Sequence, residues 1–337
     1  MRLAERSVQF LAPAVLVCLT ALLGSFSATT NEVYFETALV DVAIVVGLYL
    51  FVGNSGVLSF GHISFVAVGA WGAGVLSVPV DEKSLIFPSL YGFLGDTTVD
   101  NVVSLAVAAG VGLVYAVVVG LPLMRLSGLA AGIATFAVLE ITHNILRYWD
   151  RIGPGTNSFS SVPETTGLLQ SAIGALIAIV VAFAYQSSRF GRQLRAVRED
   201  AAAARAAGIG VVRQRVWAFG LSGALAGLAG GLYVHFIPLS TEDVYLDLTF
   251  ITLAMLVIGG AGSLWGAVVG ALAVSALDSF LAEAESGIGI AGTTLDLPSG
   301  SRLIVVGFLM ALVLILRPSG ITGGREFSLA WTGRMRR

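Results

Sequence analysis

The sequence predicts an all-α fold, a polytopic bundle of transmembrane helices. Apolar residues make up 56% of the chain and charged residues only 12%, about half the charge of an average soluble domain. The apolar residues gather in runs long enough to cross a bilayer, and basic residues are concentrated in alternate connecting segments. We therefore expect a single transmembrane domain over residues 1–337 with about ten membrane segments, some of them broken or half-length.

The first apolar run, from about Val8 to Phe26, follows Arg2 and Arg6. A secretory signal peptide is one interpretation, because Ser25-Phe26-Ser27-Ala28 resembles a small-residue cleavage site. The run is longer than the ~7 to 15 apolar residues of an ordinary signal peptide. We favour a retained first span whose N-terminus is cytoplasmic.

Two apolar stretches are interrupted by glycine-rich breaks. Residues 37–78 would reach ~63 Å as one helix, about twice the hydrocarbon core, so we expect two arms around Gly53–Gly56, the first arm being the shorter. Residues 248–281, broken at Gly259–Ser263, are too few for two full spans. One arm of this second pair is expected to stop inside the membrane.

Five further runs are each expected to form one membrane helix: Asn101–Met124, Leu126–Leu146, Leu168–Gln186, Val216–Ile237 and Leu303–Leu316. The last is short and ends at Arg317-Pro318, where proline stops a helix. Residues 81–100, 149–167 and 238–247 are expected to be loops.

The longest polar interruption, residues 187–215, is here called the handle. It carries seven arginines against two acids, which predicts a cytoplasmic location. Small and apolar residues recur at steps of four and three and predict one amphipathic helix: Phe190, Leu194, Val197, Ala201, Ala204 and Gly208. Gly208 is expected to end it in a left-handed conformation. A solvated loop with headgroup-binding arginines is the alternative to a docking surface, which the apolar face favours.

The distribution of basic residues predicts the orientation. Fifteen of the nineteen fall in segments assigned to the cytoplasm: Arg2, Arg6, Arg125, the seven handle arginines, Arg317, Arg325, Arg334, Arg336 and Arg337. The opposite side receives Lys83, Arg147, Arg151 and Arg302. Such an excess marks the cytoplasmic side, so both termini are expected there.

Several classes of function are excluded by what the sequence lacks. The single cysteine, Cys18, allows no disulfide within the chain, and the three histidines are too scattered for a metal site on one helix. There is no phosphate-binding glycine loop of the Walker type and no convincing nucleophile–base cluster, so we expect neither ATP hydrolysis nor another enzymatic activity. No nucleic-acid partner is indicated.

Three segments resemble a known family. Residues 198–210, Arg-Glu-Asp-Ala-Ala-Ala-Ala-Arg-Ala-Ala-Gly-Ile-Gly, are similar to the E-A-A…G coupling loop of ABC-importer permeases. With Ser188–Arg192 before it and Ala218–Gly230 after it, this loop resembles that of the M-type permease subunit of branched-chain amino-acid importers. Further matches are Ser55–His62 and the segment from Leu126 to Glu140.

The resemblance implies a permease in the cell inner membrane that moves solute without covalent chemistry. It implies four kinds of partner: a homologous H-type permease subunit, two cytoplasmic ATPase subunits that bind ATP and Mg, an extracytoplasmic solute-binding protein, and the lipid bilayer. No cofactor is expected in this chain. Residues implied to couple to the ATPases are Arg198, Glu199, Asp200, Ala203, Ala204 and Gly208. Asn54 and Asp200-Ala201 depart from the common pattern, which leaves branched-chain amino acids, other amino acids, urea and short amides open as substrates.

The two breaks predict the substrate pathway, because irregular backbone at membrane depth must be packed against protein or line a cavity. We expect them to meet near mid-membrane, with these residues on the path: Gly53, Asn54, Ser55, Gly56, Ser59, Gly61, His62, Gly259, Gly260 and Ser263. Free amides where a helix restarts would suit a carboxylate. The alternative is that the glycines only permit close packing. For His62 we favour a buried imidazole hydrogen-bonded to a neighbouring carbonyl over a group that carries protons.

Other polar and small residues allow two interpretations each. Glu140, His143 and Arg147 share a helix face and form a possible polar network, either structural, as a Glu140–Arg147 network, or part of translocation. Asp41 and Asp278 are expected to be interface anchors. The glycines at 220, 223, 227, 230 and 231 predict close helix packing or a seam with a partner.

An ion-coupled secondary transporter is the alternative class of function. It would require an acidic residue near the middle of a span, whereas the acids at 41, 140 and 278 all fall toward one surface.

Overall fold

The computed structural model describes residues 2–27, 29–87, 89–290, 293–295, 298 and 300–327. Ten apolar helices form the bundle: α1 (Arg2–Ser25), α2 (Thr29–Ser55), α3 (His62–Ser77), α6 (Asn101–Leu123), α7 (Leu129–Tyr148), α8 (Leu168–Ser187), α11 (Val211–Val234), α12 (Leu246–Gly259), α13 (Leu264–Ser286) and α14 (Ser301–Leu316). Seven are long and apolar enough to cross a membrane, and α3, α12 and α14 are shorter. The predicted polytopic helical bundle with half-length helices is confirmed.

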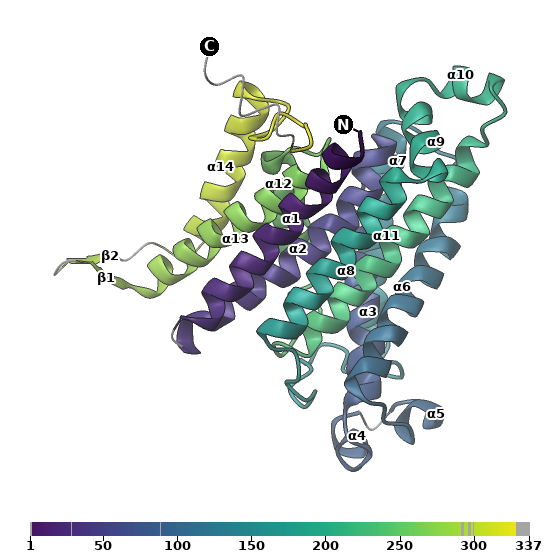
Figure 1. Cartoon of the computed structure of the whole chain (residues 1–337). Helices are drawn as coiled ribbons and strands as arrows, with labels where there is room; N and C mark the ends of the chain where they lie inside the picture. The colour runs from purple at the N-terminus through teal and green to yellow at the C-terminus, as the bar shows by residue number, and fades with distance from the viewer. Residues whose placement is uncertain are drawn as a thin grey trace.

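The remaining elements lie outside the bundle. The connection between α3 and α6 holds α4 (Val80–Ile86) and α5 (Gly92–Gly95), and the handle holds α9 (Arg189–Glu199) and α10 (Ala201–Ala206). After α13, β1 (Ile288–Ile290) pairs antiparallel with β2 (Thr293–Leu295), a hairpin that the sequence did not predict. Figure 1 shows α4 and α5 at one end of the bundle and α9 and α10 at the other.

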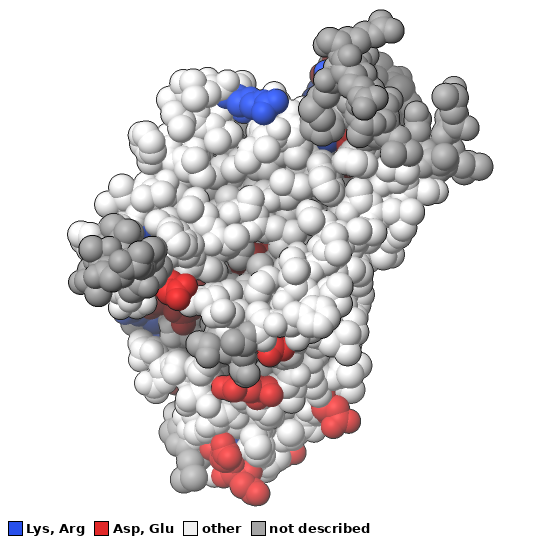
Figure 2. Space-filling model, turned by 60° about the vertical axis from the view of Figure 1, so that its left-hand side comes forward, with Lys and Arg blue, Asp and Glu red and all other residues white. Residues whose placement is uncertain are grey.

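The core of the bundle is built around α11 and α2. Helix α11 packs against α6, α3 and α2, and α2 also contacts α8 and α13. Most of α2 is buried, which explains why it is apolar on all faces. Helix α6 buries only a narrow stripe of small residues and exposes the rest of its apolar surface. Figure 2 shows a wide band with few charges, and acidic side chains gathered toward the end that carries α4.

The glycines of α11 allow close contact with two neighbouring helices. A Cβ atom on Gly227 would overlap the carbonyl oxygen of Ala108 in α6, and one on Gly230 would overlap that of Val66 in α3. Lipid tails are as apolar as the helices, so close van der Waals packing is what holds them together. These glycines therefore serve packing within the chain rather than a seam with a partner.

The first broken pair differs from the prediction. Helix α2 has 27 residues and α3 has 16, so the first arm is the long one. Helix α2 begins at Thr29, eight residues before the apolar run. Its first turns hold the polar residues Asn31, Glu32 and Glu36, which an apolar pattern does not include. The second pair has the expected inequality, with 14 residues in α12 and 23 in α13.

The segments assigned to the cytoplasm do lie at one end of the bundle. Arg215 of α11 donates to the carbonyl of Leu126, and Thr322, which follows α14, donates to the carbonyl of Gly259. The start of α1 and the end of α14 lie at this handle end as well (Figure 1). Arg334, Arg336 and Arg337 are outside the described residues.

Candidate functional site

The handle consists of two helices. Asp200 has φ −151° and ψ 107°, which interrupts the helix between α9 and α10. Its Oδ1 atom accepts hydrogen bonds from the amides of Ala202 (2.7 Å) and Ala203 (3.0 Å) and so caps the start of α10. The prediction of one continuous amphipathic helix is wrong, because this side chain offers the backbone a capped start in place of helix continuation.

The predicted end of the handle helix is confirmed. Gly208 has φ +79°, the left-handed conformation that glycine adopts without strain. Its N–H donates to the carbonyl of Arg205 (2.9 Å), and the N–H of Ile209 donates to that of Ala204 (3.0 Å). These two bonds form a Schellman motif, which satisfies the last carbonyls of α10.

The two handle helices differ in exposure. Leu194 and Val197 of α9 are buried against the bundle, whereas Phe190 is 49% exposed. In α10 only Ala204 is buried, and Ala202, Ala203 and Arg205 are exposed. Helix α9 is therefore the base of the handle, and α10 is held away from the bundle (Figure 1).

Two arginines of α9 bind the end of α2. Arg195 donates to the Oδ1 atom of Asn54 (2.9 Å) and to the carbonyl of Gln186 (2.8 Å). Arg198 donates to the carbonyl of Gly53 (2.6 Å). The aliphatic part of Arg198 also covers Gly56, where φ is +70° and an added Cβ would lie 2.8 Å from its Cγ. Guanidinium groups at a helix C-terminus satisfy free carbonyls and interact favourably with the helix dipole.

The two glycine breaks lie side by side, but not at mid-membrane as expected. An added Cβ on Gly53 would lie 2.8 Å from the carbonyl oxygen of Ala261. Because the carbonyl of Gly53 binds Arg198, this meeting point is at the handle end. The expectation of a central meeting point is wrong because α2 continues to this end, so that its break falls beside α9. Only the restart of the chain at His62 returns to the middle of the bundle, beside Ser222 of α11.

A polar cavity of 280 Å³ lies between the first break and the handle. Its lining includes Tyr49, Gly53, Asn54, Gln186, Arg192, Arg195, Gly262 and Glu326. The Tyr49 hydroxyl donates to Oε1 of Gln186 (2.7 Å). The cavity therefore presents guanidinium, carboxylate and amide groups together, which could satisfy both charges of a zwitterion.

The second break is held in a fixed conformation. Gly260 has φ +119°, and the Ser263 hydroxyl accepts the amide of Gly266 (3.0 Å), capping α13. The carbonyl of Gly259 accepts hydrogen bonds from Thr322. These bonds satisfy backbone groups that the interruption leaves without helical partners.

His62 is sealed inside the bundle. Its Nδ1 atom lies 2.8 Å from the Ser59 hydroxyl and its Nε2 atom 2.7 Å from the Ser222 hydroxyl. Since Ser222 donates to the carbonyl of Gly47 (2.6 Å), it must accept from Nε2–H, which leaves Nδ1 as an acceptor. Rings of Phe51, Phe65 and Phe219 lie within 5.7 Å of the imidazole centroid. This environment fits the buried imidazole interpretation, with hydroxyl groups as partners.

The residues around His62 are engaged in packing and local hydrogen bonds. The Ser55 hydroxyl accepts the amide of Val57 (3.1 Å), and Ser59 is 1% exposed. An added Cβ on Gly61 would overlap the carbonyl oxygen of Thr135. The hydroxyl of Thr135 accepts the amide of Phe60 (3.1 Å), so one of the amides before α3 already has a partner.

Glu140, His143 and Arg147 all bind the segment before α12, not one another. Arg147 pairs with Glu242 at 2.5 Å, and His143 lies 3.7 Å from the same carboxylate. Tyr245 donates to Glu140 and stacks on His143, with ring centroids 3.8 Å apart. The predicted polar network is therefore a structural junction between α7 and residues 242–245, in which Tyr245 and Glu242 lie between Glu140 and Arg147.

Neither Asp41 nor Asp278 is a simple interface anchor. Asp41 is only 8% exposed, and Asp278 pairs with Arg302 at 3.1 Å, which joins α13 to α14.

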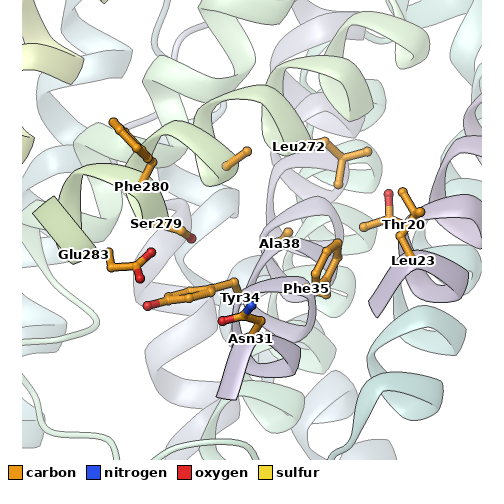
Figure 3. A pocket seen from close by; sticks show the side chains of 11 residues that line it. Thr20, Leu23, Asn31, Tyr34, Phe35, Ala38, Leu272, Ser279, Phe280 and Glu283 are labelled. Atoms are coloured by element: carbon orange, nitrogen blue, oxygen red, sulfur yellow. The ribbon is translucent and has the colours of Figure 1, made fainter. Parts of the chain in front are cut away.

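A second cavity, of 480 Å³, opens between α1, α2 and α13. Figure 3 shows Tyr34 and Phe35 on one side of it and Ser279, Phe280 and Glu283 on the other. Its wall is mostly apolar, so it suits a different occupant from the cavity beside the handle.

The profile of a protein family described as "branched-chain amino acid transport system / permease component" matches residues 36–315. The chain belongs to this family. It is thus a permease subunit of an ABC transporter, a multi-pass membrane protein and not an enzyme. In such transporters the partner ATPases bind the nucleotide.

Known relatives of the permease share 24–32% identity with it, two of them over most of its length. The high-affinity branched-chain amino acid transport system permease protein LivM of Escherichia coli (strain K12) is 24% identical over 320 residues, 84% of this chain and 68% of the relative. The probable LivM of Methanocaldococcus jannaschii is 25% identical over 304 residues, 80% of this chain and 86% of the relative. The autoinducer 2 import system permease protein LsrC of Klebsiella pneumoniae is 32% identical over 162 residues, 44% and 47% of the two chains. No solved structure matches.

Three residues of the permease site were missed by the sequence analysis. Arg195 was counted among the handle arginines, but nothing in its spacing indicates its bond to Asn54. Ser222 lies within the glycine pattern of α11, and no spacing there indicates its contact with His62. Glu326, near the end of the chain, has no local pattern, because its partners lie 61 and 62 residues away.

Proposed function

We propose that this permease imports branched-chain or other amino acids, as one of two homologous permease subunits. Its partners would be an H-type permease, two cytoplasmic ATPase subunits that bind ATP and Mg, and an extracytoplasmic solute-binding protein. The LivM relatives support an amino-acid substrate by their names. A match of 145 residues at 32% identity to the probable LivH permease of Methanocaldococcus jannaschii supports a homologous partner. Urea or short amides are the alternative substrates.

The observation that carries the proposal is the connection between the handle and the two breaks. Helix α10 is exposed, capped at Asp200 and closed at Gly208, which suits a rigid element that docks in a partner. Helix α9 connects α10 to the end of α2, because its Arg198 donates to the carbonyl of Gly53. In this mechanism Glu199 and Ala203 face the ATPase, Ala204 packs α10 onto its base, and Arg198 transmits displacement to the end of α2.

The proposed solute path leaves the bundle where the two breaks meet. The polar cavity there supplies charged and amide groups that complement an amino acid. Arg198 binds Gly53 at the first break, so a displacement of the handle would be transmitted to this point. With the handle and both termini in the cytoplasm, as the charge distribution favours, this would be the exit side of a subunit in the inner membrane. Asn54, Ser55, Gly56, Gly259, Gly260 and Ser263 would lie on the path. Gly61 and His62 would lie off the path and pack behind the residues that line it.

The test is transport by the whole complex. The permease would be co-expressed with a homologous H-type permease, the ATPases and the binding protein from the same genome, reconstituted in liposomes, and supplied with labelled leucine, alanine or urea. ATP-dependent uptake of leucine that requires the binding protein is expected. Uptake driven by a proton or sodium gradient without ATP would instead identify a secondary transporter, and uptake of urea alone would contradict the amino-acid assignment.

A further inference from the structure

The segment after α14, residues 319–327, folds back onto the turn between α12 and α13. We call it the clasp. The amide of Ile321 donates to the carbonyl of Ile258 (2.8 Å), and Thr322 donates to Gly259 through both its amide (3.2 Å) and its hydroxyl (2.8 Å). Carbonyls in the last turn of a helix lack intrahelical partners. The clasp therefore completes the hydrogen bonding at the end of α12.

Glycines on both surfaces allow the clasp to lie directly on the turn. Gly320 has φ +75°, and an added Cβ there would lie 2.5 Å from the Cα of Gly260. An added Cβ on Gly266 would lie 2.8 Å from the hydroxyl oxygen of Thr322. At Gly320 and Gly260 backbone thus meets backbone directly, a fit that a loosely attached segment does not require.

Glu326 binds the other side of the same turn. Its Oε1 accepts the amide of Leu264 (2.9 Å), and its Oε2 accepts the amide of Trp265 (3.2 Å), both in the first turn of α13. A carboxylate at a helix N-terminus satisfies free amides and complements the helix dipole. The Phe327 ring lies 5.2 Å from that of Trp265. The clasp therefore joins the end of α12 to the start of α13.

The same carboxylate also faces the handle. Glu326 lines the polar cavity together with Tyr49, Gln186 and Arg195 of α9. Burial raises the pKa of its carboxyl group, and the amides of Leu264 and Trp265 oppose that rise. Placing a partly buried carboxyl group between three elements is costly unless it is well bonded, which makes Glu326 the residue on which the clasp depends.

We propose that the clasp is a second link in coupling, in which Glu326 is a positioning residue that holds the α12–α13 turn against the end of α2 and beside the handle. A displacement of α9 would then move both breaks together, the first through Arg198 and the second through Glu326. The coupling role rests on the proposed function, whereas docking of the clasp does not. The two parts can therefore be tested separately.

Docking is tested by the reactivity of a thiol in the clasp. In a Cys18→Ser background, Thr322→Cys places a sulfur where the hydroxyl contacts Gly259, and a maleimide reports its exposure in the assembled complex. Glu326→Ala is expected to accelerate labelling about tenfold or more, since hydrogen bonds to a charged group are worth roughly 1.5–3 kcal/mol. Glu326→Gln should lie between, because it keeps one acceptor. Arg325→Ala is the matched control. Within the described part of the chain the Arg325 side chain makes no hydrogen bond or ion pair, so this variant should be labelled at the rate of the parent.

Coupling is tested by the ratio of binding-protein-stimulated to basal ATPase activity, which requires no knowledge of the solute. Glu326→Ala should reduce this ratio several-fold, and Glu326→Gln should restore part of it. Accelerated labelling with a normal ratio would overturn the coupling role, and unchanged labelling would overturn the clasp itself. If Arg198→Ala also leaves the ratio normal, the handle mechanism of the proposed function fails, whatever the labelling shows.

Discussion

The guanidinium of Arg198 donates a 2.6 Å hydrogen bond to the carbonyl oxygen of Gly53, two residues before α2 ends. The bond joins residues 145 positions apart and ties the base of the handle to the first glycine break. Arg195 makes a parallel connection to Asn54. A displacement of the handle must therefore either break these bonds or move the end of α2 with it.

Removing Arg198 should uncouple the transporter. Arg198→Ala loses a charge-assisted hydrogen bond worth roughly 1.5–3 kcal/mol, so we expect binding-protein-stimulated ATPase activity and uptake to fall about tenfold or more. Basal ATPase activity should be retained. Arg189→Ala is the matched control, because Arg189 lies exposed at the start of the same helix. Equal losses in the two variants would show that net charge on α9, and not the bond to Gly53, is what matters.

The cap at Asp200 should be replaceable by another capping residue. Asp200→Asn is expected to preserve coupling and Asp200→Ala to reduce it, since asparagine caps helices well and alanine does not. The amides of Ala203 and Ala202 hold the pKa of Asp200 below its ordinary value of 3.8. The charged cap is present above that value and is lost only as the pH falls through the lowered pKa. Coupling should thus show no titration of this residue between about pH 5 and pH 8. A clear pH dependence there that disappears in Asp200→Asn would contradict the cap.

The glycines of α11 should be sensitive to a single methyl group. Gly230→Ala would force α11 away from Val66 in α3 and is expected to cost about 1–3 kcal/mol or more. Gly110→Ala on the exposed face of α6 meets no atom within 4 Å and should be neutral or stabilising. Thermal unfolding of the two variants in detergent, followed by size-exclusion chromatography, measures the difference. Similar melting temperatures would remove the close-packing role.

The orientation can be tested with three single cysteines in a Cys18→Ser background. Ser188 lies at the handle end, and Ser89 and Ser286 lie in segments assigned to the opposite side. An impermeant thiol reagent applied to intact cells is expected to label cysteines at positions 89 and 286 and to spare position 188. Permeabilised cells, in which all three should react, provide the control. The reverse pattern in intact cells would invert the topology.

The apolar runs predicted the number of membrane segments because length and hydropathy are local properties. The start of α2 was missed because Glu32 and Glu36 lie in a helix that the apolar pattern alone does not include. The break at Asp200 was missed because a side-chain cap can override a regular apolar period. The breaks were expected to meet, but their position along the bundle depends on how far α2 extends. Contacts of Glu326 and Arg195 depend on the tertiary fold, so no spacing could reveal them.

The hydroxyl and imidazole groups around His62 have a consequence for leakage across the bilayer. Ser59, His62 and Ser222 are joined by short hydrogen bonds, as in a chain along which protons hop. The last donor, however, ends on the carbonyl oxygen of Gly47, which has no proton to pass onward. Three phenylalanine rings surround the imidazole and keep water from extending the chain. The middle of the bundle is therefore insulated, so that polar packing there does not dissipate the electrochemical gradient of the membrane.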